Sequence, residues 1–218
     1  MARPRNEALY NTIKQEAYRQ LLTNGYADTT YQSIATACGV TRTAVQNYFF
    51  SKTDLALSFF SDLLDALDTV IREKQIHQEN EFDFMFCIGQ SFFSFLLKDE
   101  NRRKLLLDLT ASREITGEVL AFEYKWGVQF LAAEQTVPDQ KFFDDVFVSM
   151  GGFYELLYRY LKDNKPFDLS THLGRVIRTI MHDHGYSYDD AKNFVAAHHM
   201  TEDELETITS AVFQLMGL

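Results

Sequence analysis

Apolar residues recur every three or four positions from residue 7 to residue 216, which is the spacing of amphipathic helices. No alternating apolar and polar run of strand length competes with this pattern. The expected helices span 7–24, two short segments after Thr30 and after Thr41 to about Tyr48, then 51–75, 81–98, 99–113, 117–135, 140–163, 169–183, 188–198 and 202–216. The sequence therefore predicts an all-α fold.

Several of these segments carry end signals. Ser51 with Asp54, and Thr201 with Glu204, have the spacing of a capping box at a helix start. Gly25 follows the first apolar run, as a C-terminal glycine does. These signals place the start of the long helix 51–75 close to the two short helices before it.

The second short helix has two different faces when residues 42–48 are placed on a wheel at about 100° per residue. The apolar face consists of Ala44, Val45 and Tyr48. The other face consists of Arg42, Thr43, Gln46 and Asn47. In the major groove Arg pairs with guanine, and Gln or Asn pairs with adenine. Two helices joined by a turn at Gly39 form a helix-turn-helix on this interpretation, although an ordinary helical hairpin with one solvated face fits the periodicity equally well.

The stretch "TTYQSIATACGVTRTAVQNYFFSKTDLALSFF" resembles the DNA-binding signature of the tetracycline-repressor (TetR) family of regulators. The resemblance rests on matching elements spread over the cap, the turn and the second helix: Thr29-Thr30, Ile34-Ala35, Gly39-Val40-Thr41, Arg42, Ala44-Val45, Tyr48-Phe49, Ser51-Lys52 and Asp54-Leu55. It implies a DNA-contacting set of Thr29, Thr30, Thr41, Arg42, Thr43, Gln46, Asn47, Tyr48 and Lys52. Many members have Gly at the position of Thr43 and an aromatic residue at that of Gln46, so these two positions leave the operator sequence open.

Charge is divided unevenly along the chain. Residues 1–53 carry a formal charge of +3, whereas the whole chain of 218 residues carries −10, so residues 54–218 carry −13. A local positive field attracts phosphates even on an acidic molecule. We therefore expect a DNA-binding domain at 1–53, continuing into the linking helix 51–75, and a helical effector-binding and dimerisation domain at 54–218.

Aromatic residues are concentrated between residues 82 and 160. Most of them must belong to the core, but the family resemblance also implies a cavity for a small, largely apolar effector. The candidate pocket residues are Gln90, Phe92, Arg113, Phe122, Trp126, Gln129, Phe130, Phe153 and Tyr154.

Residues 146–181 resemble the paired dimerisation helices of the same family. The candidate interface residues are Val148, Gly151, Gly152, Leu156, Tyr160, Leu173, Val176, Ile177 and Ile180. Close approach of helices offsets the low helix propensity of Gly151 and Gly152, unless these glycines mark a kink. A homodimer matches a palindromic operator on double-stranded DNA.

The remaining features narrow the choice of function. The two cysteines have no metal-type spacing, "HDHG" at 182–185 lacks a third ligand, and no phosphate loop or nucleophile elbow occurs, so neither an enzyme nor a metal or other cofactor is expected. No apolar run reaches 18 residues and no signal peptide is recognisable, which predicts a cytoplasmic protein and no membrane association. The family resemblance further implies a bacterial-type protein associated with the nucleoid. Segment 186–218 is predicted to form two further helices, whose role the sequence leaves open.

A ligand-released dimeric repressor is the main hypothesis for the function. A DNA-binding adaptor or co-activator with a protein partner is the alternative, and a helical enzyme or ligand carrier is a remote one.

Overall fold

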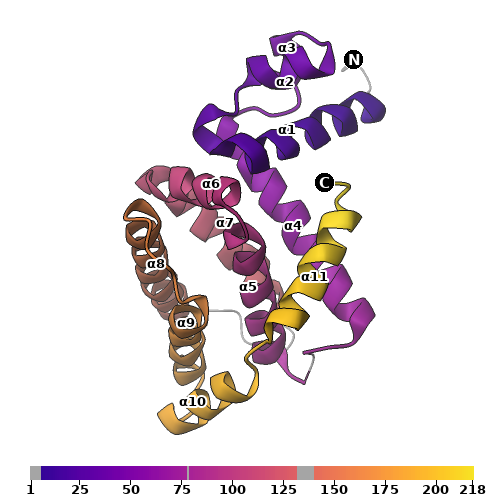
Figure 1. Cartoon of the computed structure of the whole chain (residues 1–218). Coiled ribbons are helices and arrows are strands. Elements are labelled where there is room, and N and C mark those ends of the chain that lie inside the picture. Colours follow the sequence, from indigo (N-terminus) through magenta and orange to yellow (C-terminus); the bar gives the residue numbers. More distant parts are fainter. Residues whose placement is uncertain (1–5, 78, 132–139) are drawn as a thin grey trace.

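The computed structural model describes residues 6–77, 79–131 and 140–218, and within them it leaves the side chains of residues 130, 131 and 142 undescribed. The described residues form helices and no strand, so the all-α prediction is confirmed (Figure 1). The helices are α1 (Glu7–Asp28), α2 (Tyr31–Cys38), α3 (Arg42–Gln46), α4 (Lys52–Lys74), α5 (Glu81–Leu97), α6 (Glu100–Thr110), α7 (Arg113–Leu131), α8 (Gln140–Lys162), α9 (Leu169–Asp183), α10 (Tyr188–Ala197) and α11 (Glu202–Leu215).

Four helix ends differ by two or more residues from the expected ones, and one of these is the end of α6 at Thr110, three residues before the expected 113. At Gly25 the backbone leaves helical geometry, with φ 82° and ψ 176°, but the chain then continues as a helical turn to Asp28. Helix α3 ends at Gln46, two residues earlier than expected. Helix α7 begins at Arg113, four residues early, and the last part of the segment expected to reach 135 lies outside the described residues.

The helices form a small head and a larger body (Figure 1). Helices α1, α2 and α3 make the head, and α4 runs from the head into the body. Helix α11 returns along α4 and α5, so the C-terminal end lies near the head, where the Gln15 side-chain amide donates to the Met216 carbonyl at 3.0 Å. The C-terminal segment therefore contacts both parts of the molecule.

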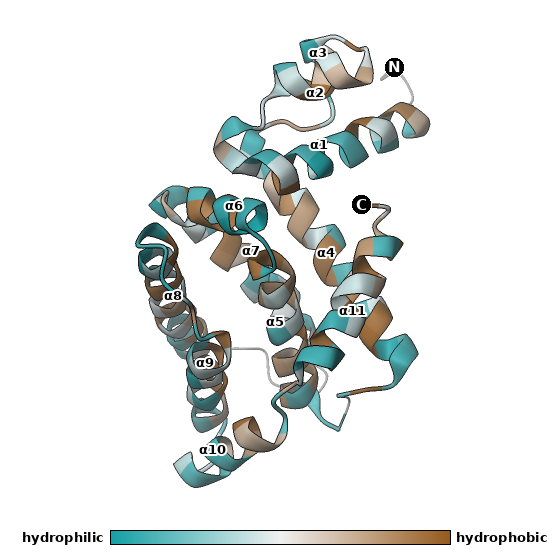
Figure 2. Cartoon of the chain, in the orientation of Figure 1, coloured by the Kyte–Doolittle hydropathy of each residue, from teal (hydrophilic) through white to brown (hydrophobic). Residues whose placement is uncertain are grey.

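Aromatic rings connect the head to the centre of the body. Tyr18 of α1 meets Phe59 of α4 with ring centroids 5.2 Å apart, and Phe60 meets Phe92 of α5 at 5.4 Å. Phe93 continues the contact to Phe153 of α8 at 4.7 Å. Such pairs contribute about 0.5–1.5 kcal/mol each beyond the area they bury. Figure 2 shows hydrophobic segments on α5 and α7 in the middle of the body.

A second joint links α1 to α6. The Asp108 carboxylate accepts a hydrogen bond from the backbone N–H of Ala27 at 2.7 Å, and Lys104 donates to the Asn24 carbonyl at 2.8 Å. Lys104 also pairs with Asp28. The kink at Gly25 lies directly against α6. A Cβ at this position would be only 2.8 Å from an Asp108 oxygen, so the close contact requires glycine. The orientation of the head is thus fixed by α6 as well as by α4.

Candidate nucleic-acid interface and ligand cavity

Local capping positions α2 and α3. Thr30 caps α2, where its hydroxyl oxygen accepts from the Ser33 N–H at 3.0 Å. Gly39 ends α2 in the left-handed conformation with φ 66°, and the Val40 N–H then donates to the Ala35 carbonyl at 2.9 Å. Thr41 caps α3 by accepting from the Ala44 N–H at 3.2 Å. The turn between the two helices is therefore specified residue by residue.

The inner face of α3 anchors it in the head. Val45 is fully buried together with Ile34 and Ala35 of α2. Tyr48 follows α3 and lies against Tyr10, with centroids 5.5 Å apart, while its hydroxyl donates to the Asn6 carbonyl at 3.2 Å. Tyr48 is therefore half-buried and holds α3 against α1.

The outer face of α3 is polar and open. Arg42, Thr43, Gln46 and Asn47 are all exposed, as is Thr41 at the cap. Because Val45 fixes the rotation of the helix, these side chains share one side of the head. The two faces expected from the helical wheel are the faces that the structure has.

Thr29, a member of the expected DNA-contacting set, does not share this open face, and its side chain is not accessible to DNA in this structure. Thr29 is fully buried, and its hydroxyl donates to the Gly25 carbonyl at 2.7 Å. The residue stabilises the kinked end of α1. Thr30 is exposed, but its hydroxyl oxygen serves the α2 cap.

Lys52 is also more engaged than expected. Its ammonium donates to the Ala27 carbonyl at 2.9 Å and lies 4.5 Å from the Tyr26 ring centroid. Burial lowers the pKa of Lys52. Two amide groups at the start of α4 are taken by the capping box of Ser51 and Asp54. Lys52 therefore ties the start of α4 to the end of α1, and the Asp54 carboxylate already accepts from the Ser51 N–H at this helix start.

Phe50 is a feature of the head that the helical pattern does not select. It lies between α3 and α4 and its side chain is 96% exposed. The sequence signal that could have found it is its position directly after Phe49, which turns inward and is buried.

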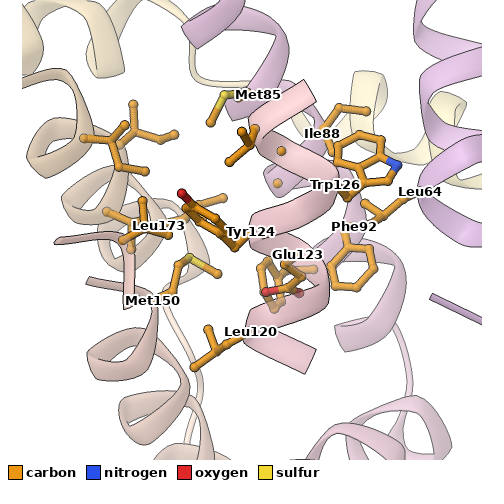
Figure 3. Close-up of a pocket in the computed structure, with 18 residues that line it drawn as sticks. Leu64, Met85, Ile88, Phe92, Leu120, Glu123, Tyr124, Trp126, Met150 and Leu173 are labelled. Atoms are coloured by element: carbon orange, nitrogen blue, oxygen red, sulfur yellow. The ribbon is translucent and has the colours of Figure 1, made fainter. Parts of the chain in front are cut away.

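The body contains an apolar cavity of about 140 Å³ (Figure 3). Side chains from five helices line it, including Leu64 of α4, Phe92 of α5, Trp126 of α7, Met150 of α8 and Ile177 of α9. Of the expected pocket residues, Phe92 and Trp126 lie in the wall of this cavity, and its use as an effector site stays a prediction.

Other expected pocket residues lie elsewhere. Gln90 is buried against the turn between α10 and α11, where its side-chain oxygen accepts from the Met200 N–H at 3.0 Å and from His199 at 2.8 Å. Arg113 and Gln129 are exposed at the two ends of α7. None of these three residues lines the cavity, and for Gln90 the reason is that helical spacing does not reveal which polar side chains a neighbouring turn will bind.

The remaining aromatic candidates lie around the cavity but not in its wall. Phe122 is half-buried, Phe153 is buried against Phe93, and Tyr154 is buried behind Glu123. The side chain of Phe130 lies outside the described residues.

Glu123 is the wall residue that the sequence interpretation missed. Its Oε1 accepts from the Tyr154 hydroxyl at 2.6 Å, and its Oε2 is buried without a hydrogen-bond partner in the described part of the chain. Burial raises the pKa of Glu123 to about 7, against a smaller lowering by the Tyr154 hydroxyl. Its spacing from Leu120 and Gly127, which line the same cavity, was the available signal.

The expected dimer interface is only partly available. Leu173, Val176, Ile177 and Ile180 are buried within the chain and line the cavity, so little of their surface is left for contact with a second copy. The apolar face of α9 covers α5 instead. Tyr160 is half-buried against Phe167 and His172.

The residues of α8 that remain are outward-facing. Val148 is 76% exposed and Gly152 is exposed, with Gly151 and Leu156 half-buried beside them. A Cβ placed at Gly151 or Gly152 would meet nothing within 4 Å. Nothing in the described chain therefore requires glycine at these two helical positions.

Two other findings concern metals and membranes. The described residues contain no group of three or more His, Cys, Asp or Glu side chains arranged to hold a metal ion. In the same part of the chain, every helix is too short or too polar to cross a lipid bilayer.

Capped helices, a closed turn and an open polar face on the second helix define a helix-turn-helix DNA-binding head. Residues 13–59 match the family of bacterial regulatory proteins described as the tetR family. This match supports membership of the TetR family of DNA-binding transcriptional regulators, which the motif predicted. None of the curated proteins compared with the chain matches it.

Proposed function

We propose that the protein is a dimeric repressor that leaves a palindromic operator when a small apolar effector fills the cavity. The observation that carries the proposal is the position of α4. This helix begins six residues after α3 ends, and its Leu64 side chain lines the cavity. A ligand at Leu64 therefore contacts the same rigid element that bears the reading head.

The head supplies the DNA contacts in this proposal. Arg42, Thr43, Gln46 and Asn47 enter the major groove, and the exposed caps Thr30 and Thr41 approach the backbone. Residues 1–53 are net positive whereas the rest of the chain is strongly negative, so electrostatic repulsion leaves the head as the face that DNA approaches. Such a regulator works on the nucleoid in the bacterial cytoplasm.

The dimer is proposed to form through the outer face of α8. The open space around Gly151 and Gly152 and the exposure of Val148 support this assignment, because a second helix can approach closely over glycine. Two recognition helices related by a two-fold axis then match two half-sites about one helical turn apart.

Coupling between cavity and head requires only a difference in effector affinity between two states, typically about 1–3 kcal/mol. In this proposal the domain at 1–53 holds the DNA-binding site and the body at 54–218 holds the effector site. Helix α4 connects the two. The α1–α6 joint at Ala27 and Asp108 gives a second route by which movement in the body reaches the head.

A variant that fills the cavity without a ligand tests this proposal. Gly127 lines the cavity, and a Cβ there would meet nothing within 4 Å. We expect Gly127→Leu to mimic the bound effector and weaken binding to a selected operator about tenfold. Gly117→Leu is the matched control, since Gly117 is on the same helix, also has open space and does not line the cavity. Equal operator affinities of the two variants, measured by fluorescence anisotropy, would contradict release through the cavity.

A further inference from the structure

The wall of the cavity contains one acidic group in an otherwise apolar surface. Glu123 projects from α7 among the side chains in Figure 3. Among the described residues of the wall there is no Lys, Arg or His. A positive group that pairs with an ionised Glu123 inside the cavity must therefore belong to a ligand.

The two oxygens of Glu123 differ in their partners. Oε1 accepts a short hydrogen bond of 2.6 Å from the Tyr154 hydroxyl, so this oxygen already has a donor. Oε2 is buried and has no partner in the described part of the chain. A buried acceptor without a donor raises the free energy of the protein. A ligand that donates a hydrogen bond to Oε2 removes this cost, which favours its binding.

The size and the walls of the cavity limit the ligand further. A volume of about 140 Å³ is close to the roughly 150 Å³ of an apolar engineered cavity that accepts benzene. Phe92, Phe93 and Trp126 present aromatic surfaces around Glu123, and aromatic faces attract cations. The cavity therefore has room for a ligand with one six-membered ring and a short substituent.

We propose that Glu123 anchors an effector consisting of one small apolar ring and a protonated amine, whose N–H donates to Oε2. This inference rests on the proposed role of the cavity as the effector site, and it names the chemical class that the site takes. Tyr154 is the positioning residue, since its hydroxyl holds the other oxygen of the carboxylate.

The protonation of Glu123 is consistent with this arrangement. Burial raises its pKa to about 7, so the empty site holds a carboxyl group that is readily neutral. The titratable groups near it are Tyr154 from α8 and Tyr124 from α7, whereas α4, α5 and α9 present only apolar wall residues in the described chain. An entering ammonium therefore draws Glu123 into its ionised form and releases its proton.

Trp126 is a built-in reporter, because it is the only tryptophan of the sequence and lies in the wall. Its fluorescence is titrated with 2-phenylethylamine, 2-phenylethanol and phenylacetate, which share a ring and differ in charge. We expect the amine to bind at least about tenfold more tightly than the alcohol, and phenylacetate to bind most weakly. Glu123→Gln should remove the preference for the amine while keeping the affinity for the alcohol within about threefold.

The dependence on pH gives a second readout. The amine stays protonated below pH 9, so its affinity should fall about tenfold from pH 8 to pH 6 as Glu123 takes up a proton. Glu123→Gln should abolish this change. Glu118→Gln is the matched control, because Glu118 is an exposed glutamate on the same helix. Circular dichroism melting of each variant verifies that it is folded.

The outcomes separate the two proposals. Equal affinities of amine and alcohol, or an amine preference that survives in Glu123→Gln, overturn the role of Glu123 and leave the cavity as an effector site. If none of the three compounds changes Trp126 emission up to millimolar concentrations, the amine class is wrong, and the Gly127→Leu variant then decides the effector role of the cavity separately.

Discussion

The buried carboxyl group of Glu123 makes the stability of the protein depend on pH. Its pKa is raised from 4.5 to about 7 in the folded chain, so the folded state holds this proton more tightly than the unfolded state. The stabilisation is complete below the unfolded pKa and is lost as the pH rises through 7. The hydroxyl of Tyr154 on α8 offsets part of the cost of burying this group by donating to its Oε1.

Glu123→Gln should remove this dependence. We expect the variant to unfold at nearly the same urea concentration as the unmodified protein near pH 4.5, and to be more stable by on the order of 1–3 kcal/mol at pH 8. Urea denaturation at the two pH values measures the difference. Glu118→Gln, on the exposed side of α7, should show no such trend. A constant difference at both pH values would show that Glu123 is not buried in this way.

Gln46 is the residue at which base preference is most directly tested. It is exposed on α3, where the family has an aromatic residue in many members. If Gln46 reads an adenine, Gln46→Ala should relax the preference at one base pair by about 1–3 kcal/mol. Gln32→Ala on α2 is the control and should affect all sequences alike. A uniform loss for Gln46→Ala, measured on operators with single substitutions, would instead assign Gln46 to the backbone.

At the scale of elements, the joint between head and body depends on Gly25. Its φ of 82° and ψ of 176° belong to a region that is essentially restricted to glycine, and a Cβ would meet Asp108 at 2.8 Å. Gly25→Ala should lower the free energy of unfolding by about 2–4 kcal/mol and loosen the Ala27–Asp108 contact. Gly39→Ala is the control, since Gly39 also has positive φ but open space, and it should cost about 1–2 kcal/mol. Equal losses in thermal unfolding would mean that α6 does not hold Gly25 closely.

The helices were predictable because their signals are local. The capping boxes at Ser51 and Thr201 and the glycine at Gly39 specify helix ends from neighbouring residues alone. The exposed polar face of α3 was also predictable from local sequence. One buried residue, Val45, sets the rotation of this short helix.

The cavity and the interface depend on partners far apart in the sequence. On α5 apolar residues occur on more than one side of the helix, so periodicity cannot choose the side that lines a cavity. On α9 the apolar face was correctly found, but whether it covers α5 or a second chain is a tertiary question. Glu123 was missed because a glutamate on a helix is ordinarily solvated, and only packing by α8 makes it an exception.

At the scale of the whole molecule, the proposed dimer depends on the outer face of α8. Val148→Glu places a charge beside Gly151 and Gly152, where a second copy would exclude water. We expect this variant to be monomeric at concentrations at which the unmodified protein is dimeric, and to lose operator affinity by at least about tenfold. Tyr188→Glu alters a residue of similar exposure on α10 and should retain the dimer. Light scattering after size exclusion measures both, and a dimeric Val148→Glu would assign the interface elsewhere.

The most direct test of the central claim is selection of DNA fragments by the purified protein, followed by anisotropy measurements at increasing salt. We expect one palindromic sequence to be enriched and bound by two chains. Its affinity should fall steeply between about 50 and 200 mM salt, because the head releases counterions from several phosphates. Binding without enrichment of any sequence, or affinity that does not change with salt, would contradict the assignment of this protein as an operator-binding regulator.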